Sequence, residues 1–322
     1  MFAIQDKWVW DFWFAKENEV WHMYYLMAPK SLIDPDLRHW NVSIGHAISS
    51  DLYRWKDLGE CFRPSIDPSW DDYTTWTGSV VQEGTDWHLF YTGTSRAENG
   101  IKQRIGHATS KDLHSWKRVG NGLALDINPE YYEEYTPGWW HDRAMRDPHV
   151  IKNPYGGGWI MYYTARVSGT RETNEGGAIG LAKSSNLYDW KHLPPAFAGG
   201  FGQLEVPQVL EINGNWYCLF TTMKIHWSEE YKISYGQQEV SGTHYLMSKS
   251  PLGPWSIAPG AFLDGDDPCE RYSGKIVESD GELLFIGFHD KDGKNRFIGE
   301  ISDPIQVSVT NEGLLQLNTN FT

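Results

Sequence analysis

Three carboxyl groups lie in stretches of sequence that are otherwise apolar or aromatic: Asp11 in VWDFW, Asp147 in MRDPHV and Glu205 in LEVPQV. Burying a carboxylate is costly unless it is paired or hydrogen-bonded, so three such groups directed at one place would have no stabilising role. They match the needs of glycoside hydrolysis, in which one carboxylate attacks or activates water while another carboxyl group donates a proton. Taken singly, each could instead cap a strand end or pair with an arginine; taken together, they favour the catalytic interpretation.

The neighbours of these carboxyl groups suggest separate roles. A general acid must stay protonated near neutral pH, so apolar surroundings or nearby negative charge must raise its pKa. Glu205 is followed and preceded by apolar residues and is the candidate acid. Asp11 is the candidate nucleophile, and Arg146 is available to hold a nearby carboxylate ionised.

A repeated phrase indicates how the chain positions these groups. Ile-Gly-His-Ala-x-Ser-x-Asp-Leu-x-x-Trp occupies residues 44–55 and returns at 105–116, more weakly at 179–190, and as a remnant ending at Trp255. The closing tryptophans are 61, 74 and 65 residues apart, a period that suits four-stranded propeller blades and divides the 322 residues into about five. Repetition favours a structural role: Ser and Asp end a strand in a turn, Trp packs between blades, and His46 and His107 belong to the core.

Two strand-like segments precede each phrase. The second is rich in aromatic and β-branched residues, as in WHMYYLM, WHLFYTG, WIMYYTA, WYCLFTT and LLFIGF. The first strands read VWDFWFA, WTGSVVQE, MRDPHVIK, LEVPQVLE and YSGKIVES. The first strand of each propeller blade lines the central axis. The sequence therefore predicts an all-β fold, a five-bladed β-propeller with four-stranded antiparallel blades around a central funnel, as a single catalytic domain over residues 1–322.

The composition favours one kind of partner over others. The net charge of −14 would repel phosphate backbones, so we expect no nucleic acid as a partner. The acidic surplus, with 17 Trp and 17 Tyr, suits a neutral polyhydroxylated ligand, because carboxylates accept hydrogen bonds from hydroxyls and aromatic rings cover apolar sugar faces. We expect a small sugar or oligosaccharide as the substrate.

Membrane, disulfide and metal signals are missing from the sequence. No apolar run approaches the roughly 20 residues of a membrane span, and no basic segment followed by an apolar one opens the chain, so we expect no membrane partner and a cytoplasmic protein. Cys61, Cys218 and Cys269 are too few and too scattered for a disulfide framework or a zinc motif. No loop has the spacing of a recognised calcium motif, so neither a metal nor a cofactor is expected.

Two further segments contain candidate substrate contacts. Residues 131–145 separate the second and third blades, and a loop over the funnel would place Trp140 at the substrate rim; packing at a blade interface is the alternative. Glu270 and Arg271 precede the fifth inner strand and could reach the funnel, although acidic turns of this kind are usually solvated.

Four segments in order, VWDFW, WTGS, MRDPH and LEVPQVLEINGNWY, resemble the signature segments of the five-bladed fructan-active enzymes of glycoside hydrolase families 32 and 68, and most closely the levansucrase and invertase group of family 68. The resemblance implies that Asp11 is the nucleophile, that Asp147 stabilises the transition state through sugar hydroxyls, and that Glu205 is the acid/base. It also implies that four residues line the fructosyl pocket, namely Trp10, Trp76, Thr77 and Arg146.

The chain departs from the family 68 pattern in positions that recognise the sugar beyond the fructosyl unit. Val206 follows Glu205 where that family usually has an arginine, and Lys224 or His226 stands where an arginine follows the next strand. Recognition of the leaving sugar should therefore differ from that of the family 68 enzymes.

The sequence thus predicts a retaining glycosidase that cleaves or transfers a terminal furanosyl unit, best matched by β-D-fructofuranosyl, through double displacement. An inverting arabinofuranosidase or xylosidase of the family 43 type is one alternative, because it shares the five blades and three inner carboxylates. Carboxyl separation distinguishes the two, at roughly 5 to 5.5 Å for retaining enzymes and roughly 6.5 to 9.5 Å for inverting ones. A carbohydrate-binding propeller without catalysis is the other alternative.

Overall fold

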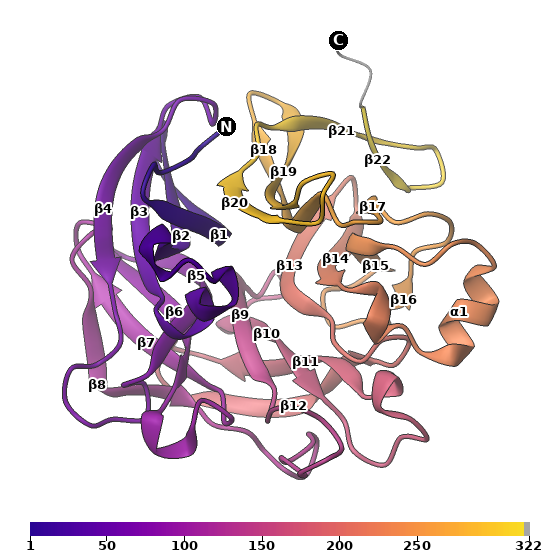
Figure 1. Cartoon of the computed structure of the whole chain (residues 1–322), viewed down its shortest axis with the longest axis horizontal. Coiled ribbons are helices and arrows are strands. Elements are labelled where there is room, and N and C mark those ends of the chain that lie inside the picture. The colour runs from indigo at the N-terminus through magenta and orange to yellow at the C-terminus, as the bar shows by residue number, and fades with distance from the viewer. Residues whose placement is uncertain (319–322) are drawn as a thin grey trace.

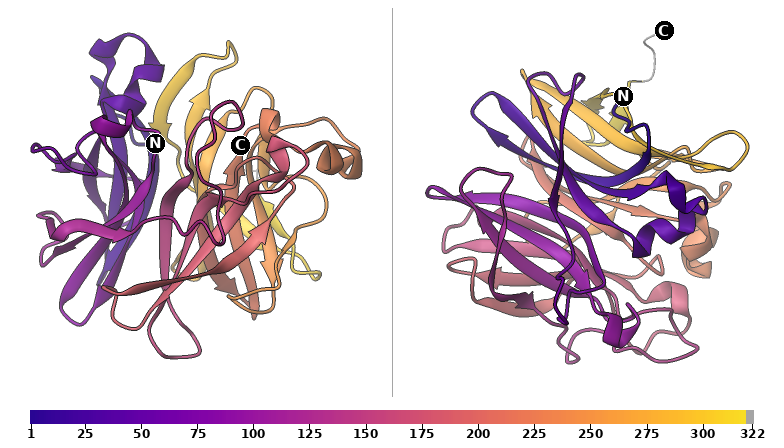
Figure 2. Two further views of the ribbon diagram at one scale, coloured as in Figure 1. Left: turned by 90° about the horizontal axis from the view of Figure 1, so that it is seen from below. Right: turned by 60° about the vertical axis from the view of Figure 1, so that its left-hand side comes forward.

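The computed structural model describes residues 1–318 and consists of five antiparallel sheets around a common centre (Figure 1). Within each sheet, consecutive strands of the chain are neighbours, apart from two short edge strands. The amino terminus returns to the last sheet, where Phe2 and Ile301 exchange two backbone hydrogen bonds of 2.9 Å. Figure 2 shows the first sheet (indigo) beside the last (yellow), which closes the ring. The predicted five-bladed β-propeller is confirmed.

The first three blades contain four strands each. Blade one consists of β1 (Lys7–Glu17), β2 (Val20–Pro29), β3 (Ser43–Ser49) and β4 (Lys56–Phe62). Blade two consists of β5 (Thr74–Glu83), β6 (Asp86–Thr94), β7 (Arg104–Ser110) and β8 (Lys117–Leu125). Blade three consists of β9 (Met145–Lys152), β10 (Trp159–Arg166), β11 (Gly177–Ser184) and β12 (Trp190–Ala198).

Blades four and five each have an additional short strand. Blade four consists of β13 (Glu205–Ile212), β14 (Asn215–Thr222), β15 (Ser241–Ser248) and β16 (Ser256–Ile257), with β17 (Asp264–Asp266) also paired to β15. Blade five consists of β18 (Arg271–Ser279), β19 (Glu282–Lys291), β21 (Ile305–Val309) and β22 (Leu315–Leu317), with β20 (Phe297–Ile301) also paired to β19.

Short helices occur in the connections between strands. The 3-10 helices are η1 (Lys30–Leu32), η2 (Pro35–Trp40), η3 (Arg96–Glu98), η4 (Thr173–Glu175) and η5 (Lys224–His226), and α1 (Glu229–Tyr235) follows η5. Over residues 1–318 none of the helices has the length and apolar character that crossing a membrane requires.

The repeated phrase forms the turn between the third and fourth strands of a blade. In blade one the Asp51 carboxylate accepts hydrogen bonds from the backbone N–H groups of Tyr53 and Arg54, at 2.9 and 2.8 Å. The indole N–H of Trp55 donates to the carbonyl oxygen of Leu52 at 2.9 Å. Blade two repeats the carboxylate contacts. The predicted role of the phrase as a strand-ending turn is confirmed.

The glycine of the phrase makes room for a tyrosine of the neighbouring strand. A Cβ atom at Gly45 would lie 2.2 Å from the ring of Tyr25, and one at Gly106 would lie 2.2 Å from the ring of Tyr91. Both rings are fully buried, so a larger residue at either glycine would overpack the core of the blade.

The histidines of the phrase are core residues, as predicted. His46 is 1% exposed and His107 is 2% exposed. Each lies 2.9 Å, nitrogen to nitrogen, from a histidine of the preceding strand, His22 in blade one and His88 in blade two. Burial, together with the neighbouring imidazole, lowers the pKa of His46 to about 3, and the pKa of His107 is lowered to about 3 for the same reasons.

Candidate active site

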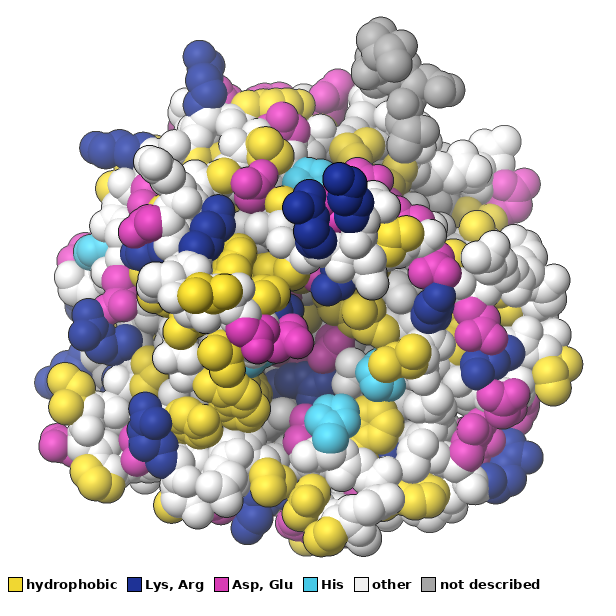
Figure 3. All heavy atoms as spheres, viewed as in Figure 1, with side chains coloured by type: hydrophobic (Ala, Val, Ile, Leu, Met, Phe, Trp, Pro, Cys, Tyr) yellow, Lys and Arg dark blue, Asp and Glu magenta, His cyan; other side chains and the backbone are white. Residues whose placement is uncertain are grey.

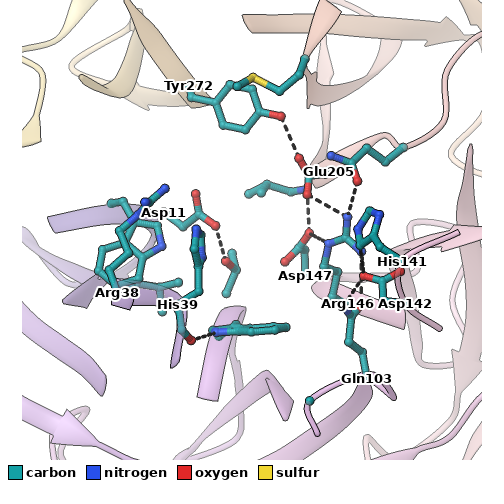
Figure 4. Close-up of a pocket in the computed structure, with 18 of the residues that line it drawn as sticks. Asp11, Arg38, His39, Gln103, His141, Asp142, Arg146, Asp147, Glu205 and Tyr272 are labelled. Carbon is teal, nitrogen blue, oxygen red and sulfur yellow. Dashed lines mark hydrogen bonds and ion pairs between the residues drawn. The ribbon is translucent and has the colours of Figure 1, made fainter. Parts of the chain in front are cut away.

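A cavity of about 590 Å³ opens at the centre of one face. Figure 3 shows the hollow with histidine side chains on one side of its mouth and hydrophobic side chains on the other. Each blade contributes to the lining through its first strand: Asp11 on β1, Thr77 on β5, Asp147 on β9, Glu205 on β13 and Tyr272 on β18. The structure therefore brings the three predicted carboxyl groups to one place (Figure 4).

The first strands share an irregularity at the end that lines the cavity. The pairing of each with the second strand of its blade shifts register within residues 10–12, 76–78, 146–149, 205–208 and 272–275. A bulge leaves a residue out of the ladder and redirects its side chain. Asp147, Val206 and Ser273 have positive φ angles of 58°, 53° and 53°, a conformation that is strained for residues other than glycine. All five first strands thus have a bulge beside the cavity, and three of them, β9, β13 and β18, are also strained there.

Asp11 is held by one hydroxyl on each carboxylate oxygen. Thr77 Oγ1 donates to Oδ2 at 2.7 Å, and Ser273 Oγ donates to Oδ1 at 2.5 Å. Burial raises the pKa of Asp11, and the hydrogen bonds from Ser273 and Thr77 oppose that rise. The two hydroxyls thus fix the carboxylate in one orientation.

Asp147 lies across the cavity from Asp11 (Figure 4). Its Oδ2 accepts hydrogen bonds from Thr164 Oγ1 at 3.0 Å and from the backbone N–H of Val206 at 3.1 Å. Burial raises the pKa of Asp147 to about 7; Arg146 lowers it, and the nearby carboxylates add to the rise. One carboxylate oxygen is thereby fixed by the protein.

Glu205 has a cation on one oxygen and a phenol on the other. Arg146 Nη2 donates to Oε1 at 2.7 Å, and the Tyr272 hydroxyl donates to Oε2 at 2.7 Å. Burial raises the pKa of Glu205, but Arg146 and Tyr272 outweigh burial and bring the pKa below its usual value. The expectation that apolar neighbours raise this pKa is therefore wrong, because the groups that decide it come from other blades.

Arg146 connects Glu205 to three other side chains of the cavity wall. It donates to Gln103 Oε1 at 3.2 Å, to Asp142 Oδ2 at 3.4 Å and to Gln203 Oε1 at 3.0 Å. Burial lowers the pKa of Arg146, but the carboxylates of Glu205, Asp142 and Asp147 outweigh burial and raise the pKa, so Arg146 remains a cation. The guanidinium is saturated with acceptors and can hold Glu205 in one orientation.

The remaining predicted substrate contacts divide into two groups. Trp10, Trp76, Thr77 and Arg146 line the cavity. The Trp76 indole N–H donates to the His39 carbonyl oxygen at 2.8 Å, which fixes this ring in the wall.

Trp140, Glu270 and Arg271 are not among the lining residues. Trp140 packs behind the rim, with the Arg166 guanidinium 3.7 Å from its ring centre. Arg271 donates two hydrogen bonds of 2.9 Å to Asp264 and one of 2.9 Å to Glu270. Trp140, Glu270 and Arg271 therefore contact neighbouring side chains of the protein and do not line the cavity.

Three lining residues, Tyr272, Arg38 and Asp290, and one partner of Asp11, Ser273, were not predicted. Tyr272 and Ser273 lie on the first strand of blade five, which the sequence places at the axis without distinguishing either residue as functional. Arg38 on η2 and Asp290 on β19 also line the cavity, and they come from segments outside the repeat pattern of inner strands.

Comparison with known proteins gives a family. The model of the glycosyl hydrolases family 32 N-terminal domain matches residues 8–296. A sucrose-6-phosphate hydrolase of Bacillus subtilis is 25% identical over 245 residues, which cover 73% of this chain and 46% of that protein. A levanbiose-producing levanase of the same species is 25% identical over 212 residues, covering 65% of this chain and 36% of that protein. The chain spans less than half the length of these curated relatives.

Solved structures share the fold over nearly the whole chain. An inulosucrase from Halalkalicoccus jeotgali bound to kestose superimposes with a TM-score of 0.79 at 19% identity, covering 98% of this chain and 87% of that one. A levansucrase from Gluconacetobacter diazotrophicus gives a TM-score of 0.77 at 18% identity, covering 100% of this chain and 82% of that one.

Proposed function

This chain belongs to glycosyl hydrolase family 32, and on that premise we propose that it cleaves or transfers a terminal β-fructofuranosyl unit by double displacement. The observation that carries the proposal is the convergence of Asp11, Asp147 and Glu205, from the first strands of three blades, on one cavity. The names of the relatives, a sucrose-6-phosphate hydrolase and a levanase, support fructosides as the substrate class.

In the first step Asp11 attacks the anomeric carbon of the furanosyl unit, and the bond to the leaving oxygen breaks. Glu205 gives its proton to that oxygen, so the leaving sugar departs as a neutral alcohol. The hydroxyls of Thr77 and Ser273 hold both oxygens of Asp11, which limits the carboxylate to one orientation of attack.

In the second step Glu205 acts as the base. It takes a proton from water, or from the hydroxyl of an acceptor sugar, as the oxygen attacks the anomeric carbon and releases Asp11. The low pKa that Arg146 and Tyr272 give Glu205 favours this ionised state, and loss of the Asp11 charge in the covalent intermediate lowers the pKa further. The electrostatics therefore suit the base more than the acid.

Asp147 is suited to bind hydroxyls of the furanosyl ring. Thr164 and the Val206 N–H share one of its oxygens, which leaves the other to accept from the sugar. A hydrogen bond from a ring hydroxyl to this carboxylate strengthens as positive charge develops on the ring, and so stabilises the transition state.

The test is to incubate the protein with sucrose and quantify free glucose and free fructose separately, beside an Asp11→Asn variant. Equal amounts would indicate hydrolysis, and glucose in excess would indicate fructosyl transfer. Proton NMR during the first turnovers should show β-fructofuranose, the retained anomer. Initial release of the α-anomer would contradict double displacement, and equal turnover by Asp11→Asn would contradict its role as nucleophile.

A further inference from the structure

Five carboxyl groups line the cavity, and one of them has no hydrogen-bond partner. Asp11, Asp142, Asp147 and Glu205 each accept at least one hydrogen bond from a side chain. Asp290 accepts none from any residue in the described part of the chain, 1–318, and its Oδ2 is fully buried. Asp290 as a whole is only 5% exposed.

Among the residues that line the cavity, Arg38 is close enough to Asp290 for the charge of each to shift the pKa of the other. Asp290 stands near the end of β19 in blade five, while Arg38 belongs to η2, which follows the second strand of blade one. Figure 4 shows Arg38 on the side of Asp11, across the cavity from Asp147. Arg38 donates to the Pro35 carbonyl oxygen at 2.9 Å, and it forms no ion pair with Asp290.

The fold itself does not compensate Asp290. A buried carboxyl group without donors costs free energy, and native proteins seldom keep one without a use. Burial accordingly raises the pKa of Asp290, while Lys291 and Arg38 lower it. The two-step chemistry at Asp11 and Glu205 makes no demand on this group. A ligand that donates a hydrogen bond to Asp290 would remove its cost.

The shape of the cavity indicates which part of a ligand reaches this end. The proposed mechanism puts the anomeric carbon against Asp11 and directs the ring hydroxyls at Asp147, which lies on the opposite wall (Figure 4). The polar groups of a fructofuranosyl unit that remain are its two hydroxymethyl groups. Phe288 and Trp10 also line the cavity and offer apolar contact to a methylene carbon.

We propose that Asp290 accepts a hydrogen bond from a hydroxymethyl hydroxyl of the furanosyl unit, with Arg38 as the neighbouring donor, so that the pair selects substrates with a neutral hydroxymethyl group at this position. The inference rests on the proposed fructosidase function. A carboxylate beside the guanidinium makes this end unsuited to a phosphate or carboxylate substituent, since the anion would face Asp290.

The test compares Asp290→Leu and Asp290→Asn with wild type on sucrose and on sucrose analogues deoxygenated at C1 or at C6 of the fructosyl unit. Asp280→Asn is the matched control, because it removes one aspartate charge from an exposed hairpin of the same blade. We expect Asp290→Leu to lower kcat/KM for sucrose by about ten- to a hundredfold, the range for a hydrogen bond to a charged group. Its melting temperature should be unchanged or higher, because an uncompensated buried carboxyl group is gone.

With one of the two deoxy analogues, wild type and Asp290→Leu should have the same kcat/KM, because that analogue lacks the hydroxyl that donates to Asp290 in the wild type. A variant whose kcat/KM for sucrose equals that of wild type would overturn the inference while leaving the proposed function intact. So would a loss of equal size on sucrose and both analogues, or a fall in melting temperature that accounts for the lost activity. A wild type that turns over no fructoside would instead refute the proposed function itself.

Discussion

The hydroxyl of Thr77 should help to set the pH at which Asp11, the proposed nucleophile, becomes ionised. It donates to Asp11 Oδ2 at 2.7 Å, and Thr77 is only 2% exposed, so bulk water does not readily replace it. This hydrogen bond lowers the pKa of Asp11 against the rise that burial causes. In Thr77→Val the side chain keeps its shape and loses the donor, so the pKa of Asp11 must rise.

The size of the effect follows from the strength of the bond. A hydrogen bond to a charged group contributes about 1.5 to 3 kcal/mol, and one pKa unit corresponds to about 1.4 kcal/mol. The acidic limb of kcat/KM, below which the nucleophile is protonated, should therefore move up by about one to two pH units. Above that limb the rate should fall much less, because the second hydroxyl, from Ser273, still orients the carboxylate.

The assay is the pH profile of kcat/KM for sucrose hydrolysis. Thr75→Val is the control: Thr75 lies on the same strand and is fully buried, and its hydroxyl has no hydrogen-bond partner within residues 1–318. Its loss should leave the profile unchanged. An acidic limb that stays in place in Thr77→Val would refute the reasoning, as would an equal shift in Thr75→Val.

Three other perturbations have defined outcomes. Tyr272→Phe removes a hydrogen-bond donor from Glu205, so the pKa of Glu205 should rise by about one to two units. Carbon NMR would measure this pKa from the Glu205 carboxyl signal, which is identified by its absence from the spectrum of Glu205→Gln. An unchanged pKa would show that Tyr272 does not stabilise the ionised form of Glu205. Gly106→Ala should destabilise the fold by roughly 1 to 3 kcal/mol in urea unfolding, because the new methyl group meets a buried tyrosine ring. The fold lowers the pKa of His46 and of His107 from 6.5 to about 3, so between these two pH values the unfolded chain binds more protons than the folded one. The free energy of unfolding should therefore be highest above pH 6.5, as far as these two histidines determine it, and should decrease as the pH falls to about 3. Unfolding free energy that stays constant over this range, or an equal slope in His46→Gln, would contradict it.

The scaffold could be predicted because its determinants are local and repeated. The turn of the phrase depends on contacts within five residues, from Asp51 to Trp55, and it recurs with the blades. A period of this length, with strand-like segments before each turn, specifies the number of blades and which strand of each lies at the axis. Asp11, Asp147 and Glu205 could be predicted to lie together because each is on the first strand of its blade.

The environment of the carboxyl groups could not be predicted, because it is not local. Arg146 is 59 residues from Glu205 along the chain, and Tyr272 is 67 residues from it. The neighbours of Glu205 in sequence are apolar, yet the groups that touch its oxygens are a cation and a phenol. The pKa of a buried acid depends on such contacts more than on adjacent residues.

Charged residues near the funnel were harder to place than those on its strands. Arg271 begins an inner strand, yet Asp264 on the neighbouring short strand binds its guanidinium outside the cavity. Arg38 and Asp290 reach the lining from a helix and from the end of a second strand. A propeller sequence identifies the residues that point inward along regular strands, whereas loops and strand ends bring others that follow no period.

The repeats separate stability from chemistry at opposite ends of each blade. At the turn end, the aspartate contacts of blade one recur in blade two, and Asn186 makes the same kind of contact in blade three, because these turns meet the same hydrogen-bonding requirement. At the cavity end, all five first strands bulge, yet the residues beside the bulges differ, from Asp11 to Thr77 to Ser273. Because the same bulge occurs beside different side chains, the Asp11 carboxylate and its two hydroxyl donors, Thr77 and Ser273, lie on three different strands. The geometry at Asp11 then depends on the closure of the ring, because no single blade contains both this carboxylate and the two hydroxyl donors that hold it.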